Sequence, residues 1–319
     1  MSKIVQSNSM TRFFALVGAL LVACGPSAAA TNDPKAGPMD GAAERTTVEQ
    51  WRAARVADLT GEQGWLTLVG LFWLEKGDNS FGRSPANRLV LEHPALAPRA
   101  GKFVLDSRGI HFTAQRDSGI AHAGQPVTSL DMVPDSEGEP TVMSSGSLRI
   151  WIIRRSDKLG VRIRDVDSPR RREFTPIEYY PIDTGWVFDA RFEPYEPHRH
   201  IRIVNILGLE EEMDCPGALV FSRDGQQWRL DAVLEDPHDP TLFVMFADRT
   251  NGDGTYGGGR FLRVPLPAGG TSRVDFNTAY NPPCAFNDFA TCPLPPQQNH
   301  LALRVESGEK VYGNGHGGH

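Results

Sequence analysis

The sequence predicts a mainly β fold, an antiparallel barrel or sandwich that carries a short helix near its N-terminus. Three observations support this fold class. Roughly ten short runs rich in Ile, Val and aromatic residues follow residue 64, turn sequences such as Asp-Gly separate them, and no strand–helix alternation of a parallel sheet occurs. The 319 residues are 40% hydrophobic and 23% charged, so a core of ordinary size can form.

Residues 1–23 have the pattern of an export signal. The apolar run Phe13–Ala23 follows positively charged residues and is far shorter than the about 20 residues of a membrane-spanning helix. The run ends in Leu21-Val22-Ala23-Cys24, which resembles the lipobox of bacterial lipoproteins. This resemblance implies a lipid-modified Cys24 at the mature N-terminus. An ordinary secretory signal cut after Ala28-Ala29-Ala30 is the alternative, and it would discard Cys24.

The same pattern predicts organisation and location. We expect a flexible tether over residues 24–43, a single β-rich domain over 44–312 and a disordered tail over 313–319. An exported protein held at the cell envelope by a lipid anchor would have the membrane as a partner. The net charge of −6 argues against a nucleic-acid partner. The basic cluster within 162–172 also contains acidic residues, so we expect a solvated strand end and loop there.

The expected elements follow in chain order. A helix is predicted over Glu44–Leu59, because Val48, Trp51 and Arg55 fall on one face. The apolar segment Gly64–Leu74 indicates a buried strand or tight turn. Asp224-Gly225 and the turn at 251–254 predict hairpins. Strands are expected at 148–154, 161–164, 186–192, 201–207, 218–222, 228–234, 242–247, 256–264, 273–276 and 301–305.

Residues 275–299, called the strap below, are the segment that we expect to determine ligand specificity. The segment is polar, and its five prolines fix φ and remove hydrogen-bond donors, so the loop is stiff. The candidate ligand-binding residues are Arg260, Asp275, Asn277, Tyr280 and Asn281, and Arg260 is expected to pair with Asp275. Alternatively, the strap is a plug that closes one end of a barrel, with polar groups that only satisfy buried backbone.

Three cysteines remain after Cys24. In an oxidising compartment Cys284 and Cys292 are a candidate disulfide, which leaves Cys215 unpaired. The alternatives are free thiols, or a reactive or metal-binding cysteine that would need a nearby cation or histidine. We find no motif of a metal site, a nucleotide-binding loop or a catalytic serine elbow in the sequence. Metal ligands are therefore not predicted, and cofactors and catalytic residues stay unassigned.

Three segments carry a resemblance to a known family. They are Gly64–Leu74, Thr255–Leu262 and the strap, from Asp275-Phe276-Asn277-Thr278-Ala279-Tyr280-Asn281-Pro282-Pro283-Cys284-Ala285-Phe286 through Thr291-Cys292-Pro293-Leu294-Pro295-Pro296 to Asn299. These segments resemble the DUF1684 family, and the resemblance covers nearly the whole mature chain, as a single DUF1684-like domain over 44–312. The family has no assigned function, so the resemblance implies kinship and no reaction.

Three hypotheses of function follow. The first is a protein that binds a small ligand in a pocket bounded by the strap and Arg260, where Trp65, Phe72, Trp73 and Phe286 would suit an apolar or aromatic molecule. The second is a hydrolase that uses the polar groups of the strap, and the third is a purely structural envelope lipoprotein. An open hollow lined by aromatic residues would favour binding, whereas an acid–base or Cys–His pair would favour catalysis.

Overall fold

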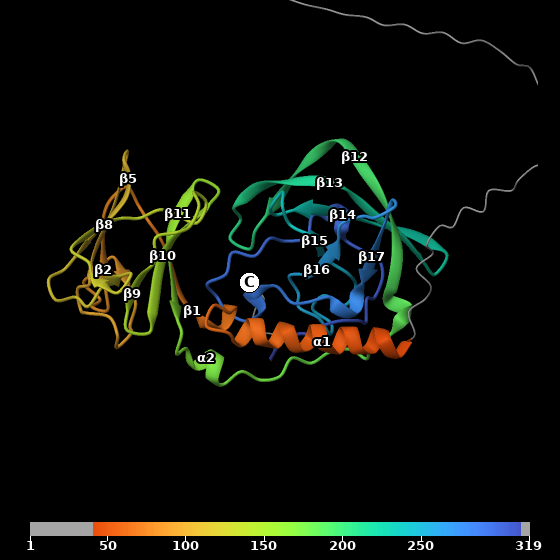
Figure 1. Ribbon diagram of the computed structural model, residues 1–319, viewed down its shortest axis with the longest axis horizontal. Helices are drawn as coiled ribbons and strands as arrows, with labels where there is room; N and C mark the ends of the chain where they lie inside the picture. The colour runs from red at the N-terminus through yellow and green to blue at the C-terminus, as the bar shows by residue number, and fades with distance from the viewer. Residues whose placement is uncertain (1–40, 314–319) are drawn as a thin grey trace, which may run out of the picture. The chain divides into compact units, whose positions relative to one another are not determined.

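The computed structural model describes residues 41–313. The predicted signal peptide, Cys24, most of the tether and the tail after residue 313 lie outside the described residues. Helix α1 (Gly41–Thr60) confirms the predicted helix and begins slightly before it. Its residues Glu44, Val48 and Leu59 are buried, and the Glu44 carboxylate pairs with Arg273 on β17 (Thr271–Asp275), an edge strand of one of the two six-stranded sheets. The helix therefore packs along that sheet (Figure 1).

The predicted antiparallel β architecture is confirmed. Six strands in the order β16-β15-β14-β13-β12-β17 curl into a nearly closed barrel. One part of its core surrounds Phe276, whose ring contacts Trp186, Phe188, Phe221 and Phe246 at centroid distances of 5.3–6.0 Å. The barrel strands are β12 (Val187–Val204), β13 (Glu210–Arg223), β14 (Gln226–Leu234), β15 (Thr241–Phe246), β16 (Arg260–Pro265) and β17 (Thr271–Asp275).

The N-terminal half of the domain contains two further sheets, in the orders β1-β11-β10-β9-β6-β7 and β3-β2-β4-β5-β8. They share a buried apolar cluster that includes Phe81, Phe103, Ile150 and Ile163. Their strands are β1 (Leu68–Trp73), β2 (Gly77–Gly82), β3 (Leu89–Val90), β4 (Gly101–Asp106), β5 (Gly109–Ala114), β6 (Ala121–His122), β7 (Gln125–Pro126), β8 (Ser129–Asp131), β9 (Met143–Ser145), β10 (Leu148–Arg155) and β11 (Lys158–Asp165).

Short helices connect these strands, and turn chemistry fixes the hairpins. The helices are α2 (Pro169–Arg172), η1 (Trp65–Thr67), η2 (Thr184–Trp186), η3 (Phe276–Thr278), η4 (Pro283–Ala285) and η5 (Gln297–Asn299). Asp224 and Gly225 adopt φ values of 54° and 72°, the left-handed conformation of a tight hairpin turn, and they join β13 to β14 as predicted. The predicted turn at 251–254 lies between the antiparallel strands β15 and β16.

The strand prediction differs from the structure in several places. It omits the strands β2–β9, and residues 256–259 precede β16 instead of belonging to it. Residues 301–305 are irregular because this segment is held by single contacts, such as the Leu301 N–H to the Ala247 oxygen, instead of a ladder. The ranges 186–192 and 201–207 belong largely to the single strand β12. Pro194 falls at a register shift in the pairing of β12 with β13, and the pairing continues on both sides of this shift.

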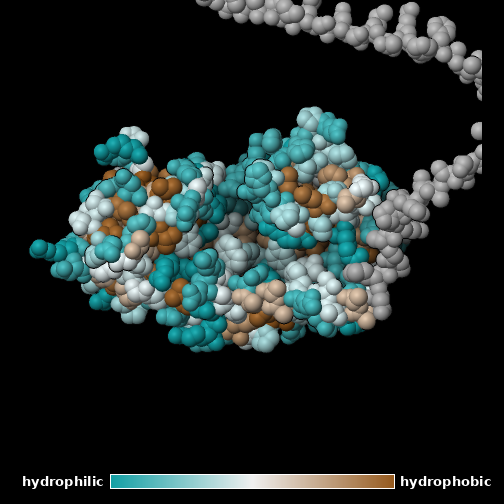
Figure 2. Space-filling model, in the orientation of Figure 1, coloured by the Kyte–Doolittle hydropathy of each residue, from teal (hydrophilic) through white to brown (hydrophobic). Residues whose placement is uncertain are grey.

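The surface of the domain is mixed. Figure 2 shows hydrophilic residues interspersed with small hydrophobic patches on the face in view. Between residues 41 and 313, none of the helices combines the length and the apolar character needed to cross a bilayer.

Candidate functional site

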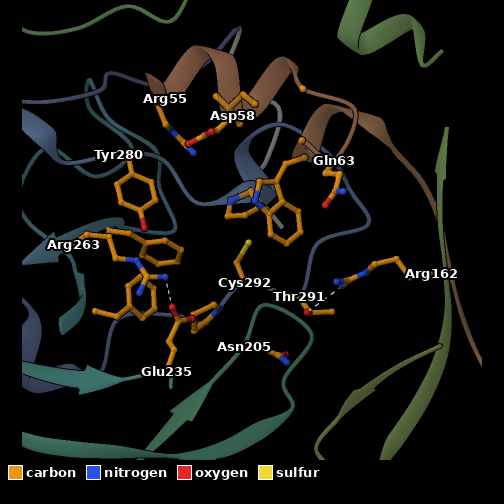
Figure 3. A pocket seen from close by; sticks show the side chains of 18 of the residues that line it. Arg55, Asp58, Gln63, Arg162, Asn205, Glu235, Arg263, Tyr280, Thr291 and Cys292 are labelled. Atoms are coloured by element: carbon orange, nitrogen blue, oxygen red, sulfur yellow. Dashed lines mark hydrogen bonds and ion pairs between the residues drawn. The ribbon is translucent and has the colours of Figure 1, made fainter. Parts of the chain in front are cut away.

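A cavity of about 1150 Å³ borders the strap. Its walls come from the C-terminal half of α1 and the turn after it, from β11, from the ends of β12 and β13, and from β15 and β16 (Figure 3). The strap itself contributes Tyr280, Pro283, Thr291, Cys292 and Pro293. The strap thus faces a hollow, which is the arrangement that the ligand-binding hypothesis requires.

Backbone and amide contacts hold the strap against the barrel. The Ile206 N–H donates to the Cys292 oxygen at 2.9 Å. The side-chain amide of Asn299 donates to the carbonyl oxygens of Asp231 and Met245, each at 2.8 Å. Because these groups are buried and paired, the strap forms a fixed wall of the cavity.

Aromatic rings form much of the cavity wall. Phe243 and Phe261 meet edge to face with their centroids 4.9 Å apart, and Phe261 meets Tyr280 in the same way at 5.8 Å. Trp51 on α1 and Trp65 after it also line the cavity. The wall therefore offers flat apolar surface to a bound molecule.

Four arginines line the cavity, and three of them have carboxylate partners. The pairs are Arg55 with Glu309 at 3.0 Å, Arg155 with Asp135 at 2.9 Å, and Arg263 with Glu235. Figure 3 shows Arg263 and Glu235 beside Tyr280, across the cavity from the fourth arginine, Arg162. The charges of the three paired arginines are thus balanced locally.

Arg162 differs from the other three arginines. It is 4% exposed, and no carboxylate of the described residues lies within 4.0 Å of its guanidinium. Its contacts are long, at 3.3 Å to the Thr291 hydroxyl and 3.5 Å to the Phe289 carbonyl oxygen, and its Nε has no partner there. Burial, followed by the neighbouring Arg155, lowers the pKa of Arg162 to about 10, so the side chain stays charged at neutral pH.

The burial of Arg162 corrects a sequence prediction. The basic cluster at 162–172 was expected to be a solvated strand end and loop, but Arg162 sits within β11 and is buried. Its neighbours Val161 and Ile163 face the apolar cluster on one side of the sheet, so Arg162 projects from the other side, toward the strap. The alternation Val161-Arg162-Ile163-Arg164 indicates a strand with arginines on one face. The same pattern is equally typical of a surface strand whose arginines are solvated, so it does not predict the burial of Arg162.

Of the five predicted ligand-binding residues, only Tyr280 lines the cavity. Arg260 is fully buried and pairs with Asp248 at 2.8 Å, so the predicted pair with Asp275 does not form. Asn277 and Asn281 are also fully buried. For these residues the plug interpretation describes the structure better, because most of their polar groups bond to backbone; among the described residues only Arg260 Nε and Asn281 Oδ1 lack a partner in this set.

Buried amide contacts show this role directly. The Asn277 amide donates to the Asp183 oxygen at 2.9 Å and accepts from the Asp183 N–H at 2.9 Å. The Asn281 amide donates to the Lys310 oxygen at 2.7 Å. Both residues therefore tie the strap to neighbouring irregular segments.

Asp275 caps η3 and is expected to affect the pH dependence of stability. Its carboxylate accepts from the Asn277 N–H at 2.8 Å, but burial raises its pKa above the ordinary 3.8 despite these hydrogen bonds. As the pH rises above 3.8, the unfolded chain loses the proton before the folded one, so this group destabilises the fold progressively. Asp275→Asn keeps an accepting oxygen, and we expect it to gain stability relative to wild type between pH 4 and pH 7.

Urea unfolding at the two pH values measures this difference. A relative stability of Asp275→Asn that is constant or falls with pH would contradict the assignment.

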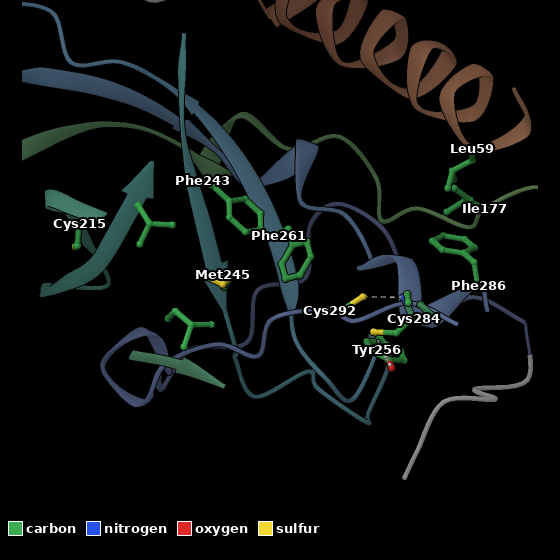
Figure 4. Close-up of a cluster of buried hydrophobic side chains, with 14 of the residues drawn as sticks. Leu59, Ile177, Cys215, Phe243, Met245, Tyr256, Phe261, Cys284, Phe286 and Cys292 are labelled. Carbon is green, nitrogen blue, oxygen red and sulfur yellow. Dashed lines mark hydrogen bonds between the residues drawn. The ribbon is translucent and has the colours of Figure 1, made fainter. Parts of the chain in front are cut away.

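The cysteines lie in the apolar cluster next to the cavity (Figure 4). Cys215, Cys284 and Cys292 are buried free thiols, so the described residues include no disulfide. The Cys284 N–H donates to the Cys292 sulfur at 3.0 Å, which places the two residues in contact. A hydrogen bond from Cys292 lowers the pKa of Cys284. Closure of this pair by an oxidant stays a prediction.

A second polar cluster lies on the β5–β8 surface. The two ring nitrogens of His111 lie 2.6 Å from the Ser129 hydroxyl and 2.7 Å from the Asp131 carboxylate, the order of groups in a hydrolase triad. However, the Asp131 side chain is 93% exposed, so water competes for its hydrogen bond and the imidazole is not held in a dry site. We interpret this cluster as a cross-strand surface contact, since His111 and Asp131 are direct strand partners.

Comparison with known proteins identifies kinship and no activity. Residues 172–310, which span the barrel sheet and the strap, match the model of a family described as "Protein of unknown function (DUF1684)". The segment 64–74 and strands β1–β11 lie outside this match. No curated protein matches the chain.

One similar solved structure is the solution NMR structure of an uncharacterised protein of Haloarcula marismortui. It is 31% identical and covers 44% of this chain and 80% of its own, with a TM-score of 0.38. Through residues 172–310, the chain belongs to the DUF1684 family of proteins of unknown function.

Proposed function

We propose that this protein binds a small molecule in the cavity beside the strap. The observation that carries the proposal is a hollow of about 1150 Å³, slightly above the roughly 300–1,000 Å³ of typical ligand sites, which combines an aromatic wall with charged and polar side chains. The fixed contacts of the strap mean that the cavity exists before a ligand arrives. A preformed site loses less conformational entropy on binding than a flexible one.

A substitution that fills part of the cavity is expected to weaken ligand binding. Ala54 is an exposed residue of α1 that lines the cavity, so Ala54→Trp would fill part of the space without disturbing the core. We expect N-phenyl-1-naphthylamine, a neutral probe that fluoresces in apolar sites, to bind the wild type saturably at one site. Ala54→Trp is expected to weaken this binding at least tenfold.

Thr46→Trp is the matched control, because Thr46 is exposed on the same helix but does not line the cavity. It is expected to bind the probe like wild type, and both variants are expected to keep the wild-type melting temperature. Absence of saturable binding to the wild type, or equal binding by all three proteins, would refute a ligand site in this cavity.

We further propose that the protein is exported and held at the cell envelope by a lipid on Cys24. The support is the apolar run Phe13–Ala23, which ends directly at this cysteine. Several acyl chains on one cysteine would anchor the protein firmly, because a single chain binds membranes only marginally. The cavity would then bind molecules that are present outside the cytoplasm.

Cys24→Ala tests the anchor. In a bacterial host grown with radiolabelled palmitate, we expect the full-length wild type to incorporate label and to sediment with membranes, and Cys24→Ala to do neither. Label in both proteins, or in neither, would contradict a lipid on Cys24. Cys215→Ala, which removes a buried thiol of the domain, is expected to leave labelling unchanged.

A further inference from the structure

Arg162 is a charged group without a charged partner in an otherwise balanced wall. Asp58, Glu62 and Glu211 also line the cavity, but these carboxylates are exposed and therefore hydrated. Asp135 is paired with Arg155, and Glu211 accepts from the Ser156 N–H at 3.0 Å. The described residues thus supply no buried negative charge to Arg162. An isolated buried cation costs several kcal/mol, and an anion brought beside it recovers part of that cost.

Further donors lie on the same side of the cavity as Arg162. Figure 3 shows Arg162 reaching toward Thr291, with Asn205 nearby on the β12 side. The Asn205 oxygen accepts from the N–H groups of Leu207 and Leu209 at 2.9 and 3.1 Å, so its amide nitrogen is the group left to donate. A guanidinium, a hydroxyl and an amide together form a set of donors suited to a carboxylate or phosphate.

The neighbouring surface limits what can carry the anion. The Trp65 ring lies 6.0 Å from the Arg162 guanidinium carbon and lines the same cavity. Cys292 and Pro293 of the strap add apolar surface beside Thr291. A molecule with its anionic group at Arg162 would therefore place a flat or apolar body between Trp65 and the aromatic wall formed by Phe243, Phe261 and Tyr280.

We propose that the ligand is a small amphiphilic anion, whose carboxylate or phosphate binds Arg162 and whose apolar body lies against the aromatic wall. This inference rests on the proposed ligand-binding function and names its ligand class. Arg162 would give charge selectivity, while the aromatic wall would supply affinity that depends little on charge.

Matched acid and amide probes test the inference. We would measure 2-naphthoate, 2-naphthyl phosphate and the neutral 2-naphthamide by displacement of N-phenyl-1-naphthylamine. We expect at least one of the anions to bind the wild type about ten- to a hundredfold more tightly than the amide, the range expected for one charge-assisted interaction. A preference for naphthoate would identify a carboxylate ligand, and a preference for naphthyl phosphate would identify a phosphate.

Arg162→Met is expected to remove the preference for anions and to leave binding of 2-naphthamide and the displaced probe unchanged. Arg164→Met is the matched control, because Arg164 lies two residues along β11 and does not line the cavity. It is expected to keep the preference. Equal binding of acids and amide by the wild type, or an unchanged preference in Arg162→Met, would overturn the anion site while leaving a ligand cavity intact. Failure of the displaced probe to bind the wild type would refute both proposals.

Discussion

Replacing Arg260 by methionine is expected to lower the free energy of unfolding by about 3–5 kcal/mol, because it breaks a fully buried ion pair. The guanidinium pairs with the Asp248 carboxylate at 2.8 Å, and both side chains are 0% exposed. It also donates to the carbonyl oxygens of Val305 at 2.8 Å, Glu309 at 3.3 Å, and Ser307. Methionine fills similar space but leaves a buried carboxylate and three carbonyl groups without their donor.

Urea unfolding followed by circular dichroism measures this loss, and Arg263→Met is its control. Arg263 lies on the same strand, but it is 39% exposed and pairs with the equally exposed Glu235. Its replacement is expected to cost no more than about 1 kcal/mol. Asp248→Asn, which keeps the side-chain shape, is expected to destabilise in the same direction as Arg260→Met. Similar losses for Arg260→Met and Arg263→Met would contradict a structural role specific to the buried pair.

Replacing Arg162 by methionine is expected to have the opposite sign and to raise the free energy of unfolding by about 1–3 kcal/mol in the absence of ligand. The pKa of Arg162, lowered to about 10 mainly by burial, shows that the fold disfavours this charge. Methionine removes the charge and keeps the apolar stem of the side chain. The lost hydrogen bonds, at 3.3 and 3.5 Å, are long and contribute little.

The same urea unfolding experiment distinguishes a ligand-binding from a structural Arg162. A side chain that is kept for binding commonly lowers the stability of the protein, so replacing it raises the free energy of unfolding. Replacing a side chain that supports the fold lowers that free energy. A loss of more than about 1 kcal/mol in Arg162→Met would therefore mean that its contacts to the strap are structural. In that case the preference for anions would need another explanation.

The two buried arginines also show how far sequence reasoning reaches at the site. Both follow an ordinary strand pattern, and the sequence alone predicts a ligand-binding Arg260 and a solvated Arg162. Their roles depend on whether a carboxylate from a distant segment meets them. Asp248 meets Arg260, and no carboxylate of the described residues meets Arg162. Such encounters are tertiary, and spacing along the chain does not report them.

The sequence predicted the strap well as a segment, but it did not predict which of the strap's side chains face the cavity. Its prolines and polar composition indicated an irregular, stiff loop, and it does line the cavity. Which side chains face the cavity was not predictable, because turns of η3 and η4 direct Asn277 and Asn281 inward to backbone and Tyr280 toward the cavity. A strand has a fixed alternation that predicts direction, but an irregular segment has none.

The sequence by itself determined the β-rich fold class, the N-terminal helix and the hairpin at Asp224-Gly225, because hydrophobic periodicity and backbone preferences act over a few residues. It also marked the strap as unusual. Only the tertiary structure decided that the strap, α1 and β11 share one cavity, because Tyr280, Trp65 and Arg162 are brought together by contacts between segments far apart in the chain. Burial and charge pairing are properties of that assembly, and they separate a structural arginine from one available to a ligand.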